Sequence, residues 1–155
     1  MEIIAVKPVT EKDIKEFEDL VYEYILQPDN WPREDFFFPP ATEAIIRKYL
    51  FKNKATGETV GTGAVRMIEE GMARISYVCL KKKYQGLGLG RMMVHLLEVT
   101  AFKLGAIKLQ LASVQGKEGF YTKLGYYISG EEKDECQGKV CFSKVLMKNL
   151  YKTRL

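Results

Sequence analysis

The stretch that decides the fold lies at residues 84 to 91 and reads Tyr84-Gln85-Gly86-Leu87-Gly88-Leu89-Gly90-Arg91. Alternating residues from Met72 to Leu80 precede it and predict a strand, and a helical stripe that stops at Gly105 follows it. Glycines here let the backbone approach a ligand closely, while the first amides of the incoming helix are unpaired and carry the positive end of its dipole. The sequence therefore predicts a site for phosphate or diphosphate.

Two common nucleotide-binding motifs do not fit this stretch. A P-loop needs Gly-Lys followed by Ser or Thr, whereas Gly90 is followed by Arg91 and Met92. A dinucleotide-binding fingerprint needs a third glycine, which is missing after Gly88 and Gly90. The anion at this loop is therefore expected to belong to another kind of ligand.

The pattern Gln85-x-x-Gly88-x-Gly90 resembles the acyl-CoA-binding motif of the GNAT superfamily of N-acetyltransferases. Residues 118–126 are similar to that family's second motif, a short helix with a Phe-Tyr pair that ends in Leu-Gly-aromatic. The resemblance covers the element order from residue 3 to about 149. It implies a mixed α/β (α+β) fold, with a central mixed sheet of six to seven strands flanked by about four helices.

The resemblance also implies roles for individual residues. Tyr121 matches the tyrosine that in many family members protonates the departing thiolate, and a phenol of pKa ~10 can donate to a thiolate whose conjugate acid has a pKa near ~8.5. An uncharged amine would attack acetyl-CoA directly, with the oxyanion accepting a hydrogen bond from a strand amide near Cys79 or Leu80. No metal is expected. The implied coenzyme-binding residues are Val78, Cys79, Leu80, Gln85, Gly86, Leu87, Gly88, Leu89, Gly90 and Arg91.

The general base is left open, because neither residues 72–80 nor residues 107–112 contain an acidic side chain, and Val114 replaces the asparagine of some members. A relayed water, a loop carboxylate or loss of the amine proton to solvent would each serve. The residues considered for the first two are Ser76, Ser113, Gln115, Asp29, Glu34 and Asp35. The missing base also keeps a second hypothesis in view, a non-catalytic acyl-CoA-binding or interaction module of the same fold.

The acceptor is expected to be a cationic primary amine, either a small molecule or a peptide amine. In this fold the acceptor enters past two segments that are acidic here, residues 27–40 and 130–138. Asp29, Glu34 and Asp35 would attract the cation, and Trp31 would offer an aromatic wall. The run Lys81-Lys82-Lys83 could attract a coenzyme phosphate, but without interleaved aromatics it does not predict a nucleic-acid partner.

Composition sets the broad class. A chain of 155 residues with 46% hydrophobic and 28% charged residues is typical of one globular domain, here residues 1–155. Three cysteines, none in a CxxC pair, and the lack of a leader or of an apolar run of ~20 residues predict a reducing, cytoplasmic location without membrane attachment. Family members are often dimers, so a homodimer is compatible with the resemblance.

Charge is unevenly distributed along the chain. Residues 1–43 carry eleven acidic and four basic side chains, whereas residues 44–155 carry nine acidic and twenty basic ones. A basic part attracts anions such as phosphates.

Periodicity predicts the remaining elements. Thr10 is expected to cap the first helix, and His95 and Cys79 are expected to be a surface histidine and a buried thiol. Helices are expected near residues 11–26, 41–49 and 117–124, and strands near 3–9, 50–54, 59–68, 107–112, 126–129 and 140–149. The stripe of the helix after the glycine loop comprises Met92, Met93, Leu96, Leu97 and Thr100.

Overall fold

A computed structural model describes residues 1–30, 33, 45–113, 118–128 and 140–145. Within these residues the chain forms a seven-stranded mixed sheet and three α-helices, and this confirms the predicted mixed α/β class. The helices are α1 (Glu11–Val21), α2 (Leu89–Lys103) and α3 (Glu118–Lys123). The strands are β1 (Ile3–Val6), β2 (Ile46–Asn53), β3 (Thr59–Glu69), β4 (Met72–Leu80), β5 (Lys108–Ser113), β6 (Tyr127–Ile128) and β7 (Val140–Val145).

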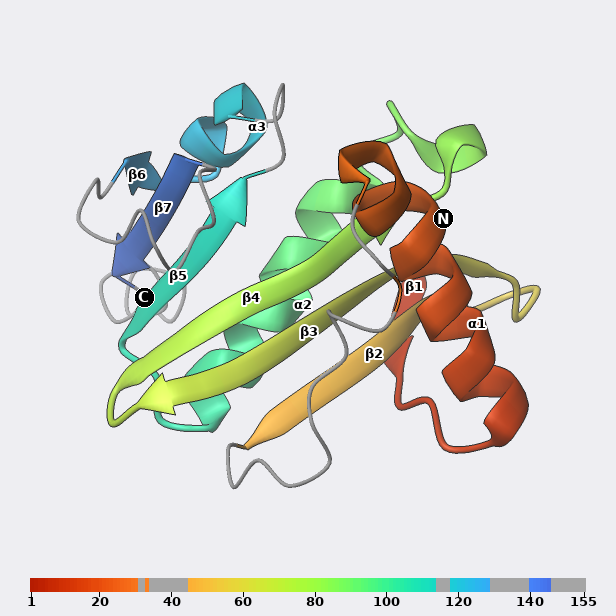
Figure 1. Cartoon of the computed structure of the whole chain (residues 1–155), viewed down its shortest axis with the longest axis horizontal. Coiled ribbons are helices and arrows are strands. Elements are labelled where there is room, and N and C mark those ends of the chain that lie inside the picture. The colour runs from red at the N-terminus through yellow and green to blue at the C-terminus, as the bar shows by residue number, and fades with distance from the viewer. Residues whose placement is uncertain (31–32, 34–44, 114–117, 129–139, 146–155) are drawn as a thin grey trace. The chain divides into compact units, whose positions relative to one another are not determined.

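The strand order is β1-β2-β3-β4-β5-β7-β6 (Figure 1). β4 pairs with β5 in parallel through three residue pairs that end at Arg74 and Gln110. β5 pairs with β7 in the antiparallel sense from Lys108 to Ser113, and β6 then pairs with β7. A parallel pair needs a long connection, which α2 supplies between β4 and β5.

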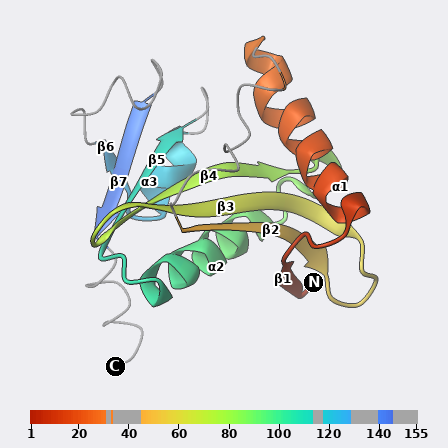
Figure 2. The same cartoon turned by 60° about the horizontal axis from the view of Figure 1, so that its bottom comes forward.

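The chain packs as two compact units. The first contains residues 1–64 and 77–97, and the second contains residues 65–76 and 98–155, so that β3, β4 and α2 each contribute to both. In the first unit, α1 and the N-terminal part of α2 cover opposite faces of the strands (Figure 2). In the second, α3 lies next to β5 and β7.

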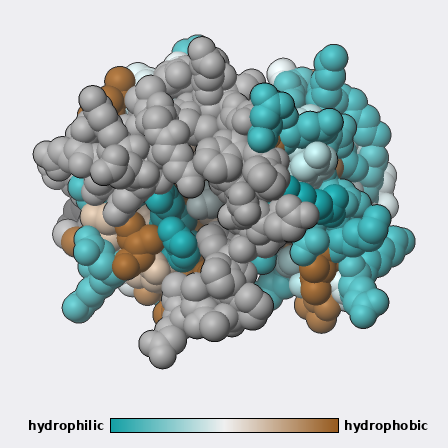
Figure 3. Space-filling model, in the orientation of Figure 1, coloured by the Kyte–Doolittle hydropathy of each residue, from teal (hydrophilic) through white to brown (hydrophobic). Residues whose placement is uncertain are grey.

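The first helix forms where the sequence predicts it. The Thr10 side chain accepts a hydrogen bond from the amide of Asp13 at 3.1 Å and caps α1, and the chain continues through a π-helical turn at Tyr22–Leu26. The buried face of this segment packs on the sheet, and its outer face is largely hydrophilic (Figure 3). The core of the first unit comprises Phe17, Leu20, Val21, Ile25, Leu26, Leu50, Ala64, Tyr77 and Cys79.

The helix predicted for residues 41–49 is wrong over its described part, because β2 begins at Ile46. The stretch from Ile46 to Phe51 contains apolar and aromatic side chains that suit a pleated surface. β1 pairs with the second half of β2, from Val6 opposite Leu50 to Ile3 opposite Asn53. β2 lies between β1 and β3 in the sheet, so sheet pairing prevails here over the helical expectation.

Candidate functional site: a glycine-rich loop and a buried tyrosine

The glycine-rich loop connects β4 to α2 within the first unit. A short 3-10 turn at Lys82–Tyr84 follows the strand, and α2 begins at Leu89. Gly86 and Gly88 have φ angles of 81° and 79°, a backbone conformation that side chains strongly disfavour. No atom lies within 4 Å of the position that a Cβ would take at either residue. These two glycines are therefore needed for the shape of the loop, and the space beside them is open.

The amides of this loop are available for a ligand. Among the described residues, the backbone amides of Gly86 to Gly90 donate no hydrogen bond outside α2. They lie at the N-terminus of a 15-residue helix, where the dipole and the unpaired amides attract anions. The exposed side chains of Gln85, Leu87 and Arg91 border the loop. This geometry fits a phosphate or diphosphate group.

Two hydrogen bonds anchor the side of the loop that follows β4. The side-chain amide nitrogen of Gln85 donates to the carbonyl of Leu80 at 2.9 Å, and this bond closes the loop onto the end of β4. The amide of Lys82 donates to the hydroxyl of Tyr24 at 3.0 Å, which ties the 3-10 turn to the first helical segment. Gln85 was predicted to bind the coenzyme, but this bond assigns its amide nitrogen to the loop itself.

A third anchor joins the loop to the turn between β2 and β3. The hydroxyl of Tyr84 donates to the carboxylate of Glu58, and the Lys83 ammonium lies 2.5 Å from the same carboxylate. The hydrogen bond from Lys83, and then that from Tyr84, lower the pKa of Glu58. Of the three lysines 81–83, Lys83 is thus neutralised by an acid that pattern analysis did not single out.

An irregularity in β4 was also not predicted. Tyr77 has a φ of 56° in the middle of the strand, a conformation that costs on the order of 1–3 kcal/mol for a residue with a side chain. The hydroxyl of Thr62 donates to the Tyr77 carbonyl at 2.7 Å, and the Tyr77 ring packs edge-on against Phe17. Packing and this buried hydrogen bond therefore hold the strand in a shape that its sequence does not reveal.

Cys79 is the buried thiol that the sequence predicts. It is 7% exposed, and its sulfur lies 3.0 Å from the hydroxyl of Thr62. Burial raises the pKa of this thiol to about 11. A thiolate is the nucleophilic form of cysteine, so Cys79 is not an activated nucleophile. His95 is exposed on α2, as expected.

Tyr121 lies in the second unit, on α3. Its side chain is 8% exposed, and burial raises the pKa of its phenol to about 12. The ring packs edge-on against Phe120, with ring centres 5.0 Å apart. Tyr121 therefore holds its proton throughout the neutral range, as a proton donor must.

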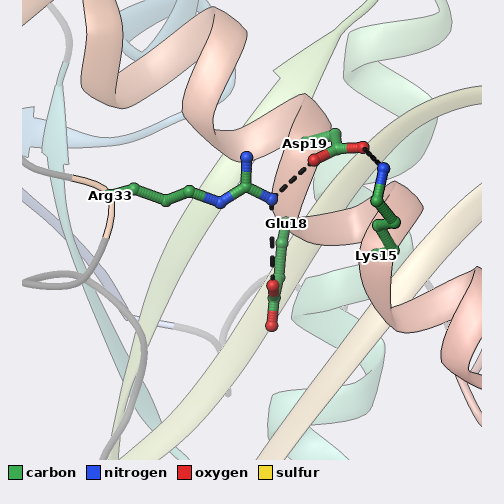
Figure 4. A network of polar contacts seen from close by, with 4 residues as sticks. All are labelled: Lys15, Glu18, Asp19 and Arg33. Carbon is green, nitrogen blue, oxygen red and sulfur yellow. Dashed lines mark hydrogen bonds and ion pairs between the residues drawn. The ribbon is translucent and has the colours of Figure 1, made fainter.

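The predicted acceptor segment is described only in part. Asp29 ends a 3-10 turn at Gln27–Asp29, and its side chain lies outside the described residues, as do Trp31, Glu34 and Asp35. Arg33 is described, and its guanidinium lies 2.5 Å from Asp19 and 3.9 Å from Glu18 on α1 (Figure 4). The hydrogen bond from Arg33 lowers the pKa of Asp19. This basic residue thus joins the segment to an acidic patch of α1.

The coenzyme-binding residues that the sequence predicts, from Val78 to Arg91, all lie in the first unit, whereas Tyr121 lies in the second. Within the described ranges, no helix is long and apolar enough to cross a membrane. No group of three metal-ligating side chains is found in that same part of the chain.

Comparison with known proteins identifies the class. Residues 12–126 match the model of the acetyltransferase (GNAT) family. YyaT of Bacillus subtilis (strain 168) is 36% identical over 75 residues, which are 48% of this chain and 50% of YyaT. The chain thus spans about half the length of the curated relatives it matches.

Solved structures share the fold. A Lactobacillus plantarum protein assigned as an N-acetyltransferase has a TM-score of 0.75 at 17% identity and covers 95% of this chain and 100% of its own. A chimera of the Vibrio cholerae spermidine N-acetyltransferase SpeG and hSSAT has a TM-score of 0.71 at 14% identity, with 97% and 99% covered. The chain belongs to the acetyltransferase (GNAT) family, whose enzymes use acetyl-CoA or another acyl-CoA as cosubstrate.

Proposed function

We propose that residues 1–155 act as a single acetyltransferase domain that moves the acetyl group of acetyl-CoA to a primary amine. The observation that carries this proposal is the glycine loop, whose amides at the start of α2 donate no hydrogen bond elsewhere among the described residues. The diphosphate of the coenzyme would accept hydrogen bonds from these amides. The end of the β4–β5 pairing at Arg74 and Gln110 supports the proposal, because pantetheine binds as an added strand where two strands separate.

In the proposed reaction, the nitrogen lone pair of an uncharged amine attacks the thioester carbonyl carbon. A backbone amide near Cys79 or Leu80 donates to the oxyanion that forms. When the tetrahedral intermediate collapses, the carbon–sulfur bond breaks and the Tyr121 phenol gives its proton to the thiolate. Water takes the proton that the amine nitrogen loses, and water in turn restores the proton of Tyr121. No covalent enzyme intermediate is needed, which agrees with the buried thiol of Cys79.

The acceptor is proposed to be a cationic amine such as a polyamine, an aminoglycoside-like amine or a peptide amine. The acidic side chains of residues 27–40 and 130–138 support this choice, because they would concentrate a cation near the site. Reversal of charge in Glu34→Lys and Asp35→Lys should then raise the KM for spermidine severalfold while leaving the KM for a neutral amine unchanged. Equal effects on both acceptors would contradict the proposed role of these carboxylates.

The test of coenzyme binding uses two matched glycines. Gly88→Ala should weaken acetyl-CoA binding in calorimetry at least tenfold, because φ is 79° at this residue and the loop must distort. Gly71→Ala is the control, since Gly71 has a φ of 78° but lies in the turn between β3 and β4. Similar losses of affinity in both variants, or no affinity in the folded wild type, would refute the proposal.

A non-catalytic acyl-CoA-binding module is the second candidate. It is favoured by the absence of acidic side chains from both β4 and β5, where family members often place a base. Acetyl-CoA turnover with a panel of amines separates the two candidates. The enzyme proposal expects product, and Tyr121→Phe should slow its formation about 10²-fold with little change in coenzyme affinity. Binding without turnover of any amine would favour the module.

A further inference from the structure

Glu98 is a buried carboxylate that the proposed reaction does not use. It lies on α2 within the second unit and is 7% exposed. The hydroxyl of Tyr126, which is 3% exposed, donates to its Oε2 at 2.9 Å. A carboxylate inside a protein is costly unless donors satisfy it, and hydrogen bonds to charged groups are stronger than neutral ones. The bond therefore holds the Tyr126 ring firmly against α2.

Tyr126 is in direct contact with the tyrosine that we propose as the acid. The two rings pack edge-on, with their centres 5.8 Å apart and their planes at 78°. The amide of Tyr126 also donates to the carbonyl of Tyr121 at 3.1 Å. Gly125, with a φ of 92°, turns the chain back after α3 so that this contact forms. Tyr121 thus packs on a ring that is itself tied to another helix.

A phenylalanine would suffice at residue 126 if only packing were required. The hydroxyl adds a directional bond to α2, and this bond fixes where the ring lies along the helix. Burial, and then the nearby carboxylate of Glu98, raise the pKa of Tyr126, so that its hydroxyl remains a donor at all working pH values. The Tyr126 hydroxyl therefore keeps the proton that it donates to Glu98.

We propose that Tyr126, held by its hydrogen bond to Glu98, is a positioning residue that fixes the ring of Tyr121 for proton donation. This inference rests on the proposed function, in which Tyr121 protonates the thiolate. Proton transfer requires that donor and acceptor lie within hydrogen-bond distance, and a small displacement of a catalytic group lowers the reaction rate strongly. A ring that shifts after loss of the bond would donate less efficiently although it remains buried.

The kinetic test is a double-mutant cycle. Tyr126→Phe should lower kcat on the order of tenfold while the KM for acetyl-CoA changes less than about twofold. In a protein that already carries Tyr121→Phe, the same change should have no further effect, because Tyr126 acts only through Tyr121. Tyr127→Phe is the control, since this neighbouring tyrosine is 48% exposed, and it should keep the wild-type kcat. Additive losses, or an unchanged kcat in Tyr126→Phe, would overturn the proposal.

Substitutions of Glu98 provide a second test, in which one variant keeps the hydrogen-bond acceptor for Tyr126 and the other removes it. Glu98→Gln keeps an oxygen that accepts from Tyr126 and should retain most of kcat. The methionine of Glu98→Met has a similar volume but no hydrogen-bond acceptor, so this variant should lose as much kcat as Tyr126→Phe. Equal loss in both variants would mean that the hydrogen bond is not the feature that matters.

A readout that does not need turnover separates this inference from the proposed function. Nuclear magnetic resonance of protein with isotope-labelled tyrosine rings identifies the Tyr121 signals by their loss in Tyr121→Phe. In Tyr126→Phe these signals should shift or broaden, and in Tyr127→Phe they should not. If the chain acetylates no amine but the signals respond as expected, the proposed function fails while the positioning stands. Unchanged Tyr121 signals in Tyr126→Phe would refute the positioning directly.

Discussion

Burial of one phenol connects proton chemistry to stability in this protein. The pKa of Tyr121 is raised from 10.0 to about 12, so the folded state holds this proton more tightly than the unfolded chain. The contribution of this phenol to stability is therefore complete below pH 10 and is lost as the pH rises toward 12. With this pKa the phenol stays protonated at neutral and mildly alkaline pH.

We expect that raising the pH from 9 to 11 destabilises the wild type by about 1 kcal/mol more than Tyr121→Phe. In the wild type the unfolded chain loses the phenol proton in this range while the folded protein keeps it, and Tyr121→Phe has no such proton. Urea unfolding at the two pH values measures the difference. Tyr127→Phe is the control, since an exposed tyrosine should leave the wild-type dependence unchanged. A Tyr121→Phe protein with the same alkaline loss as the wild type would contradict the burial argument.

The carboxylate of Glu58 acts on the loop in two opposite ways. It accepts from Tyr84, which anchors the loop, and it neutralises Lys83, which weakens the attraction for phosphate. Glu58→Gln keeps an acceptor for Tyr84 but removes the charge, and it should tighten acetyl-CoA binding about twofold at low salt. Tyr84→Phe keeps the charge and removes the bond, so it should weaken binding about threefold. Calorimetry measures the acetyl-CoA affinity of both variants. Changes of affinity in the same direction would show that the charge and the hydrogen bond of Glu58 do not act in opposite ways.

At the scale of elements, close approach of α2 to β3 depends on two glycines. A Cβ at Gly61 would lie 2.2 Å from the carbonyl oxygen of Cys79 and 2.9 Å from Cε of Met93. A Cβ at Gly63 would lie 2.7 Å from Cδ1 of Leu97, a side chain that can move. The first clash involves backbone and the second does not. Side chains of α2, Met93 and Leu97, therefore occupy the space where a Cβ would lie at these two glycines.

We expect Gly61→Ala to destabilise the protein by about 3 kcal/mol or more, and Gly63→Ala by about 1–2 kcal/mol, because overpacking costs more where backbone must shift. Gly119→Ala is the matched control. It lies in α3 with no atom within 4 Å of the added carbon, and it should stabilise by about 0.5–1 kcal/mol through helix propensity. Thermal unfolding measures the series, and a larger loss at Gly63 than at Gly61 would contradict the reasoning.

The buried stripe of α2 also differs from its sequence prediction. Met93 and Leu97 are buried as expected, but Met92 is 39% exposed, and the buried residues one turn before and after are Leu89 and Ala101. Val94 and Glu98, which follow Met93 and Leu97, are buried as well, so neighbouring pairs spaced four residues apart form the buried face.

At the scale of the whole chain, charge should assist capture of the coenzyme. Residues 44–155, which include the loop, carry a net charge of +11, and residues 1–43 carry −7. Long-range attraction between a basic region and an anionic ligand is screened by salt. The expected result is a rate of acetyl-CoA association that falls severalfold between about 20 and 200 mM NaCl, with a smaller change in the dissociation rate.

Stopped-flow measurement of association and dissociation tests this expectation. The double variant Lys81→Gln and Lys82→Gln should flatten the salt dependence, because it removes two of the cations next to the loop. Lys7→Gln, in the segment after β1, serves as the control and should leave the slope unchanged. An association rate that does not depend on salt would contradict electrostatic capture.

The sequence by itself determined the features that consecutive residues encode. The unit of β4, glycine loop and α2 and the Thr10 cap follow from local periodicity, capping and the freedom of glycine. Such features need only neighbours along the chain, so pattern analysis finds them.

Only the tertiary structure decided the contacts that join distant segments. Glu58 meets Tyr84 across 26 residues, Glu98 meets Tyr126 across 28, and Thr62 supports the irregular backbone at Tyr77. Residues 46–49 likewise form the start of β2 instead of the expected helix. These outcomes depend on which strands pair and which helix covers them, because a hydrogen bond between segments exists only after the sheet has brought its two partners together.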